Sequence, residues 1–210
     1  MTDNKINMRN RDSTKENMIK QKAIEIIVKD GLDGFTINKL AKACNISVGT
    51  PYVYYKDKDD LIVKLVIEEG NKMETLINEG FDPASSLEEG LRVQWTNRYH
   101  YAIKNPLLLP FFEQINNSHY SQQFVQMFNE KPGMFMSEFK NNLLNFISNT
   151  VQRGEMEETP FEIYWSIAFA PLYTLLRFHQ QGRNINGLPF VLTDEIIWST
   201  FNKVCKALKN

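Results

Sequence analysis

Small, hydroxyl-bearing and aromatic residues gather in the segment SVGTPYVYY, residues 47–55. Ser47 and Thr50 carry hydroxyl groups that donate and accept hydrogen bonds, and they flank Val48 and Gly49, where the chain is slim. The tyrosines add phenolic hydroxyl groups, which donate to anionic oxygens while their rings pack on protein. This chemistry favours close approach to another polar molecule.

Catalytic and metal-binding patterns are missing from the sequence. It has no nucleophile–base pair within a motif, no glycine-rich phosphate loop and no paired acids of a catalytic site. Cys44 and Cys205 lie far apart and, like His100, His119 and His179, lack metal-ligand spacing. We therefore predict no enzyme activity, no metal and no cofactor.

A cytoplasmic location is expected. The most apolar run, residues 163–178, is shorter than the ~20 residues that a helix needs to span a bilayer. The N-terminus has no apolar signal segment, and two distant cysteines favour a reducing compartment. We therefore predict no association with a membrane.

Two short predicted helices hold the 47–55 segment. Thr36 is a suitable N-cap for a helix at residues 37–44, and Ser47 is available as the N-cap of the next helix after a tight turn at residues 45–47. The first helix has one apolar face, formed by Ile37, Leu40, Ala41 and Cys44. Two short helices joined by a tight turn, the second beginning with small residues, are typical of a helix-turn-helix.

The second helix of such a motif enters the major groove of DNA, with its N-terminal residues against base edges. We therefore expect Ser47, Val48, Gly49 and Thr50 to lie at the DNA.

The tyrosines of this segment then divide into two roles. Tyr52 and Tyr54 are the predicted donors to phosphate oxygens, and Tyr55 is expected in the core. Pro51 removes a backbone donor, which predicts a short or irregular first turn of the second helix.

Longer helices are predicted on either side of the motif. A capping box at Ser13 and Glu16 marks the start of the first helix after a polar arm, and Gly31 marks its left-handed end. Asp57 and Asp60 are expected to cap a long helix that follows the motif.

The charges are unevenly distributed along the chain. Residues 1–56 hold 10 Lys or Arg against 6 Asp or Glu, and the remainder holds 14 against 19. This asymmetry is equally compatible with an anionic partner for the first quarter and with ordinary surface variation.

The run TINKLAKACNISVGTPYVYYKDKDDL, preceded by KDGLDGF, resembles the DNA-binding domain of TetR-family transcriptional regulators over about residues 16–65. The shared features are a glycine after the first helix, a threonine at the start of the second, and a third helix followed by a lysine. Leu40, Cys44, Asn45 and Pro51 depart from the family pattern. The resemblance implies that Val48 and Gly49 face bases. It implies DNA contacts, mainly to phosphates, for Thr36, Thr50, Tyr52, Tyr54 and Lys58.

Helix capping explains Thr36 and Ser47 as well as phosphate contact does, and both roles can coexist. The alternative for the whole region is a helical packing module that binds no nucleic acid.

Caps and proline breaks predict further helices in the rest of the chain. Expected are a helix from near Lys58 to Gly80, one capped by Ser85 and Glu88 and ended at residues 105–106, shorter ones at 106–117 and 119–130, one from Phe135 to Val151, one opened by Thr159 and Pro160, and a last one capped by Thr193. The predicted fold is all-α, with an N-terminal three-helix helix-turn-helix DNA-binding domain at residues 1–58 and a larger C-terminal helical ligand-binding and dimerisation domain at residues 59–210.

The helix after Pro160 is apolar nearly all round, so it needs cover on more than one side. We expect it and the last helix to pair with their copies as a four-helix bundle, and the family resemblance implies the same homodimer. Two recognition helices would then lie ~34 Å apart and bind a palindromic double-stranded DNA operator.

The sequence contains 14 Phe, 8 Tyr and 3 Trp, for which core packing is the simplest role. The resemblance also implies a largely apolar small-molecule cavity. The residues expected to line it are Trp95, Tyr99, Phe112, Phe128, Phe139, Trp165, Phe169 and Tyr173.

The predicted function is a ligand-responsive transcriptional regulator, a repressor that a small apolar or aromatic effector releases from its operator. The alternative is a DNA-binding structural or septation-linked factor without a small-molecule ligand.

Overall fold

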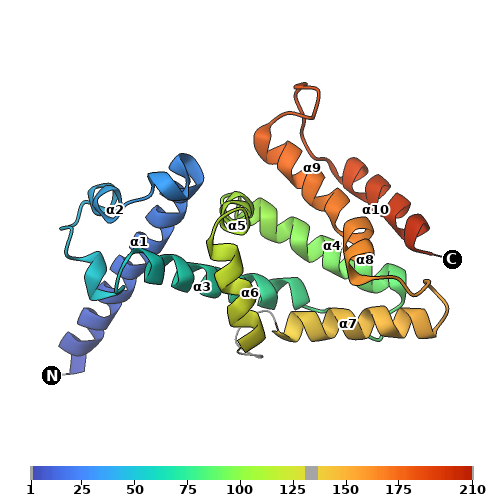
Figure 1. The fold of residues 1–210 in the computed structure, drawn as a ribbon, viewed down its shortest axis with the longest axis horizontal. Coiled ribbons are helices and arrows are strands. Elements are labelled where there is room, and N and C mark those ends of the chain that lie inside the picture. The colour runs from blue at the N-terminus through green and yellow to red at the C-terminus, as the bar shows by residue number, and fades with distance from the viewer. Residues whose placement is uncertain (1, 131–136, 210) are drawn as a thin grey trace. The chain divides into compact units, whose positions relative to one another are not determined.

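The computed structural model describes the backbone of residues 2–130 and 137–209, and the side chains of residues 13–126 and 140–209. Within these ranges the protein is all-α (Figure 1), as predicted. The elements in chain order are α1 (Thr2–Gly34), α2 (Ile37–Cys44), the 3-10 turn η1 (Pro51–Val53), α3 (Lys58–Asn78), α4 (Leu87–Lys104), α5 (Leu108–Asn116), α6 (Tyr120–Glu130), α7 (Ser137–Gln152), α8 (Phe161–Ala168), α9 (Ala170–Gln181) and α10 (Asp194–Leu208).

The helices form two compact units. The first contains residues 1–70 and 107–132, and the second contains residues 71–106 and 133–210. These units do not follow the predicted boundary at residue 58, because α5 and α6 belong with α1, α2 and most of α3. The assignment of residues 1–58 to DNA binding concerns function, and it stays a prediction.

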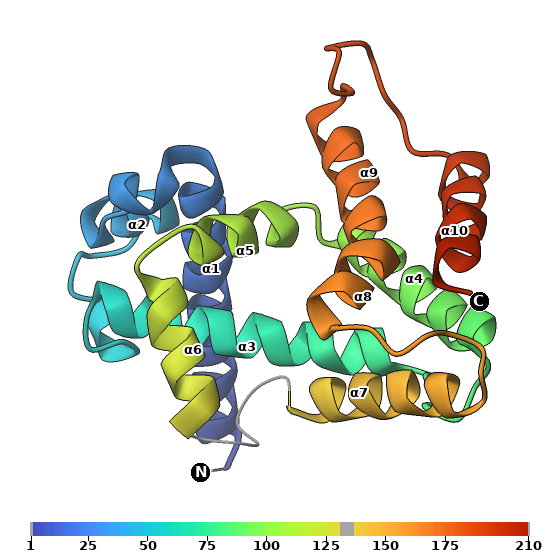
Figure 2. The ribbon, with the colours of Figure 1, turned by 45° about the vertical axis from the view of Figure 1, so that its right-hand side comes forward.

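The core of the first unit lies where α1 packs against α2 and α5 (Figure 2). Ile19, Ala23 and Ile27 of α1 are fully buried. Phe111 of α5 is also fully buried, and the neighbouring Gln114 donates its side-chain N–H to the backbone oxygen of Val28 at 3.2 Å. These apolar residues of α1 therefore form the centre of this unit's core.

The start of α1 differs from the prediction. The helix begins at Thr2 rather than at Ser13, and no Gly or Pro interrupts residues 2–30. Gly31 takes a positive φ of 77°, which bends the chain as expected for a left-handed stop. One more turn, to Gly34, follows this kink.

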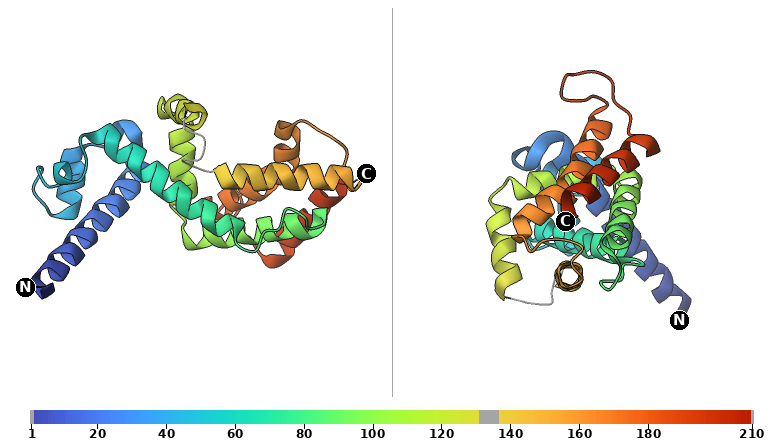
Figure 3. Two further views of the ribbon diagram at one scale, coloured as in Figure 1. Left: turned by 90° about the horizontal axis from the view of Figure 1, so that it is seen from below. Right: turned by 90° about the vertical axis from the view of Figure 1, so that its right-hand side faces the viewer.

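In the second unit, α10 packs on α8, α9 and α4, and α4 also contacts α7 and α9 (Figure 3). Trp95 of α4 is fully buried, donates its indole N–H to the backbone oxygen of Ala168 at 2.7 Å and meets Phe201 edge-on. Leu172, Leu176 and Ile197 complete this core. The predicted N-cap of the last helix, Thr193, is confirmed by its bond from the backbone N–H of Ile196 at 3.3 Å.

Three local predictions in this unit are wrong. The capping box of α4 is formed by Ser86 and Glu89, one residue later than expected. The residue at the N-cap of α8 is Pro160, which makes no side-chain capping hydrogen bond, so Thr159 is not the N-cap of this helix. The apolar stretch is two helices, because the chain breaks at Phe169, two residues before Pro171.

Gly90 is predicted to be essential for the packing of α4. A Cβ added there would lie 2.8 Å from Cζ of buried Phe146 and closer still to its Cε2. Because the added Cβ would lie well within 3 Å of a buried ring, overpacking costs about 2–3 kcal/mol, of which the gain in helix propensity offsets about 1 kcal/mol. Gly90→Ala should therefore lower Tm by roughly 2–8 °C in a thermal melt.

The matched control is Gly49→Ala, because no heavy atom lies within 4 Å of a Cβ at that position. An equal Tm for Gly90→Ala and the wild type would contradict the packing described for α4.

Candidate nucleic-acid interface

The helix-turn-helix begins as the sequence predicts. Thr36 caps α2 by accepting the backbone N–H of Lys39 at 3.2 Å. The predicted apolar face of α2 is buried: Ile37, Leu40, Ala41 and Cys44. Asn45 then takes the left-handed conformation with φ 53° and ψ 46°, and this turn sets the direction of the residues that follow.

The segment after this turn, residues 47–54, is not an α-helix. It consists of turns followed by η1, which begins at Pro51. The predicted irregular first turn is confirmed, and the irregularity extends over the whole segment. Pro51 and Tyr55 are buried, and burial is also the main reason that the pKa of the Tyr55 phenol is raised. The segment is thus anchored to the core at two points, and Tyr55 is the core residue that we predicted.

On either side of Pro51, side chains of the segment face outward. Val48, Tyr52 and Val53 are 48%, 53% and 77% exposed, and Gly49 is exposed with open space around its Cα. The surface is therefore narrow at Gly49 and carries apolar and phenolic groups beside it. A surface of this shape fits against a groove better than a bulky one.

The polar groups near the segment have partners within the protein. Ser47 Oγ and Thr50 Oγ1 lie 2.9 Å apart and share a hydrogen bond, so the Ser47 side chain does not cap a helix as predicted. The Lys58 ammonium donates to the backbone oxygen of Leu32 at 2.9 Å and lies 5.8 Å from the centre of the Phe35 ring. Because an ammonium has three N–H donors, this contact leaves Lys58 able to bind a phosphate as well.

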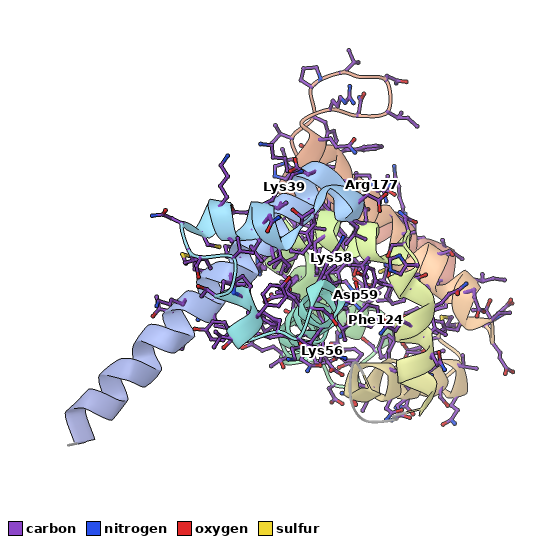
Figure 4. The ribbon with its side chains drawn as sticks, turned by 60° about the vertical axis from the view of Figure 1, so that its left-hand side comes forward. Lys39, Lys56, Lys58, Asp59, Phe124 and Arg177 are labelled. Atoms are coloured by element: carbon purple, nitrogen blue, oxygen red, sulfur yellow. The ribbon has the colours of Figure 1, made fainter. Side chains whose placement is uncertain are left out.

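Lysines lie on the elements before and after the segment. Lys39 and Lys56 are exposed, and Figure 4 marks them together with Lys58. The Lys39 ammonium donates to the backbone oxygen of Gly34 at 2.8 Å. Positive charge near the 47–54 segment favours an anionic partner.

The start of α3 is held by the two predicted acidic caps. Asp57 Oδ1 accepts the backbone N–H of Asp60 at 2.8 Å, and Asp60 Oδ2 accepts the backbone N–H of Lys56 at 2.9 Å. The Lys64 ammonium also donates to Asp60 at 2.9 Å. The hydrogen bond from Lys64, followed by that from Lys56, lowers the pKa of the Asp60 carboxyl. This cap fixes the position of Lys58.

The predicted ligand-lining residues are divided between the two units. Trp165 lies 4.9 Å from Phe169 and 6.4 Å from Tyr173 between ring centres, so these three gather in the second unit. Trp95 and Tyr99 belong to the same unit, whereas Phe112 belongs to the first. The side chains of Phe128 and Phe139 lie outside the described residues. The cavity stays a prediction.

The sequence analysis missed a buried polar cluster in α4. Gln94 and Arg98 are 0% and 3% exposed, and Arg98 Nη1 donates to both oxygens of Gln94. The Arg98 guanidinium also lies 4.2 Å from the centre of the Phe169 ring. Their spacing of four residues places both on one face of α4, but their residue types give no local sign of burial.

The described part of the chain gives no sign of two other kinds of function. It contains no group of three or more His, Cys, Asp or Glu side chains arranged to hold a metal ion. None of its helices is both long and apolar enough to cross a bilayer.

Comparisons with known proteins point to one family. A family model described as "Bacterial regulatory proteins, tetR family" matches residues 19–65. An HTH-type transcriptional regulator of Haemophilus influenzae is 28% identical over 89 residues, which are 42% of this chain and 48% of that protein. This chain thus aligns with about half the length of that relative. The fatty acid metabolism regulator protein of Bacillus subtilis is 22% identical over 136 residues, or 65% of this chain and 68% of that protein.

The likeness extends to the whole structure. A TetR family transcription regulator from Marinobacter aquaeolei superposes with a TM-score of 0.80 at 27% identity. The superposition covers 96% of this chain and 99% of the other.

The cap at Asp60 predicts a pH-dependent stability. Because the pKa of the Asp60 carboxyl is lower in the folded protein than in the unfolded chain, the ionised carboxylate stabilises the fold above the unfolded pKa of ~3.9. This stabilisation is lost as the pH falls through the pKa of the folded state. Asp60→Asn should therefore lower stability by about 0.5–1 kcal/mol at pH 7. Below the folded pKa of Asp60 the Tm values of variant and wild type should converge, because both then carry a neutral side chain.

Asp33→Asn is the control, since Asp33 is exposed and its side chain has no hydrogen bond or ion pair with the described residues. This substitution should change Tm little at either pH. A Tm deficit for Asp60→Asn that is the same at both pH values would show that the charge is not what stabilises this cap.

Proposed function

Because the chain belongs to the TetR family of DNA-binding transcriptional regulators, a non-enzymatic family, we propose that it is a cytoplasmic repressor controlled by a small effector. In this proposal a homodimer binds a palindromic operator, and a largely apolar or aromatic ligand releases it. The observation that carries the proposal is the outward-facing 47–54 segment, anchored at Pro51 and Tyr55 within the matched residues 19–65.

The proposed DNA contacts follow from this geometry. Val48 and Gly49 face bases, because they form the slim and exposed part of the segment. The exposed phenol of Tyr52 donates to a phosphate, and Thr50 and Tyr54 lie beside it. Around them, Thr36, Ser47 and Lys58 add contacts at the edges of this surface.

The proposed dimer forms through the last two helices, α9 and α10. Their inner faces are occupied by the core of their own unit, where Leu176 and Phe201 are fully buried. Leu175 and Ile196 remain only half-buried and are available to a second copy. A two-fold axis there would present two 47–54 segments to successive major grooves.

The proposed effector site involves the aromatic group of Trp165, Phe169 and Tyr173. Arg98 adds a buried positive charge against Phe169, so a ligand with an apolar body and a polar or anionic end would suit these residues. The name of the Bacillus subtilis relative makes fatty acids and their derivatives the first compounds to try. Native mass spectrometry of the purified protein tests for a bound apolar molecule, whose consistent absence would favour the ligand-free alternative.

The first test of DNA binding is to select bound fragments from the source genome and compare variants on them. Tyr52→Phe should weaken binding to every selected site by a similar factor, about ten-fold, because it removes a hydrogen bond to a charged phosphate. Electrophoretic mobility shifts at several salt concentrations measure this loss.

Tyr55→Phe is the matched control, because the same hydroxyl group is removed from a side chain only 3% exposed. It should change Tm and leave DNA affinity intact. Equal DNA affinities for Tyr52→Phe and the wild type would show that the Tyr52 phenol does not bind phosphate.

A further inference from the structure

Few side chains in the DNA-facing segment can distinguish bases by hydrogen bonding. No Asp, Glu, Lys, Arg, His or Gln lies between Lys42 and Lys56. Guanine is read most often by Arg or Lys, and adenine by a bidentate Asn or Gln. The one amide in this stretch is Asn45, which occupies the left-handed turn that ends α2. Side chains that usually identify bases by hydrogen bonding are therefore scarce in this segment.

The two aliphatic hydroxyl groups of the segment supply little specificity. Ser47 Oγ and Thr50 Oγ1 are bonded to each other at 2.9 Å, so one hydroxyl hydrogen is used within the protein. Ser and Thr hydroxyls also bond to either donors or acceptors on base edges, which makes them weak discriminators.

Two valines are the remaining exposed side chains of the segment besides Tyr52. Val48 is 48% exposed and Val53 is 77% exposed, while buried Pro51 and Tyr55 occupy the side that faces the protein. An exposed isopropyl group gains free energy when it leaves water for an apolar contact. In the major groove the apolar partner is the 5-methyl group of thymine.

We propose that Val48 and Val53 contact thymine 5-methyl groups, so that T·A pairs at two positions in each half-site specify the operator. The inference rests on the proposed function and deepens it. It adds Val53 to the expected DNA contacts and gives Val48 a defined base partner. Methyl contacts need neither charge nor an amide, which agrees with the composition between Lys42 and Lys56.

The test replaces each thymine of the genome-selected operator in turn by deoxyuridine, which keeps the hydrogen-bonding groups of the base and removes only the methyl. Wild-type protein should lose affinity about four-fold when one contacted methyl is removed, and roughly fifteen-fold when the symmetric position is changed as well. Replacements at other thymines should have no effect.

Variants then assign each methyl to a side chain. Val53→Ala should bind the all-thymine operator more weakly and lose its sensitivity to deoxyuridine at one position, and Val48→Ala should do so at another. Val191→Ala removes an equally exposed valine, 66% accessible in the loop before α10, and should retain both sensitivities. Equal Tm values for these variants exclude an effect on folding.

The outcomes separate the two claims. If wild-type protein binds genomic fragments but no deoxyuridine replacement changes its affinity, the methyl contacts are wrong and the proposed function stands. The same conclusion follows if both valine variants keep the full sensitivity. If wild-type protein binds no fragment at all, the proposed function fails, and this inference fails with it.

Discussion

The burial of one face of α2 is the constraint on which the proposed DNA-binding surface depends. Leu40 and Ala41 are within 1% of complete burial, and they fix α2 against α1. The left-handed turn at Asn45 then directs the chain, and buried Pro51 and Tyr55 return it to the core. Between these points the chain has no room to turn inward, so its small and apolar side chains must face solvent or a partner.

The same unit contains the contacts through which other helices act on this surface. Gln114 of α5 binds the backbone of α1 at Val28, and the Tyr120 hydroxyl of α6 donates to Asp59 in the first turn of α3. The backbone near Lys58 is held from the other side by the Asp57 and Asp60 caps. A change in α5 or α6 is thus transmitted by direct contacts within one compact unit. An effector needs only a difference of ~1–3 kcal/mol between two states to use such contacts for regulation.

Local sequence rules predicted the elements whose signals are local. The N-cap at Thr36, the positive φ of Gly31, the tight turn that begins at Asn45 and the acidic caps of α3 all follow from residue types within four positions. The irregular turn at Pro51 follows from its missing donor and is likewise confirmed.

Features that depend on distant contacts were not predictable in this way. The grouping of α5 and α6 with α1 depends on buried contacts such as that of Phe111, which neighbours in sequence do not encode. Arg98 looks like a surface residue by type, and only the packing of Phe169 against it reveals its burial. Ser47 had the chemistry of a cap, but a bond to Thr50 was equally accessible and prevails.

The most direct test of the central claim is the operator affinity of Gly49→Ala, measured beside its Tm. The protein offers open space for the added methyl, so folding should be unaffected. If residues 47–54 lie against base edges, the methyl must displace DNA, and affinity should fall at least ten-fold while Tm stays constant. Unchanged affinity at unchanged Tm would contradict the account, because it would mean that DNA does not approach this segment.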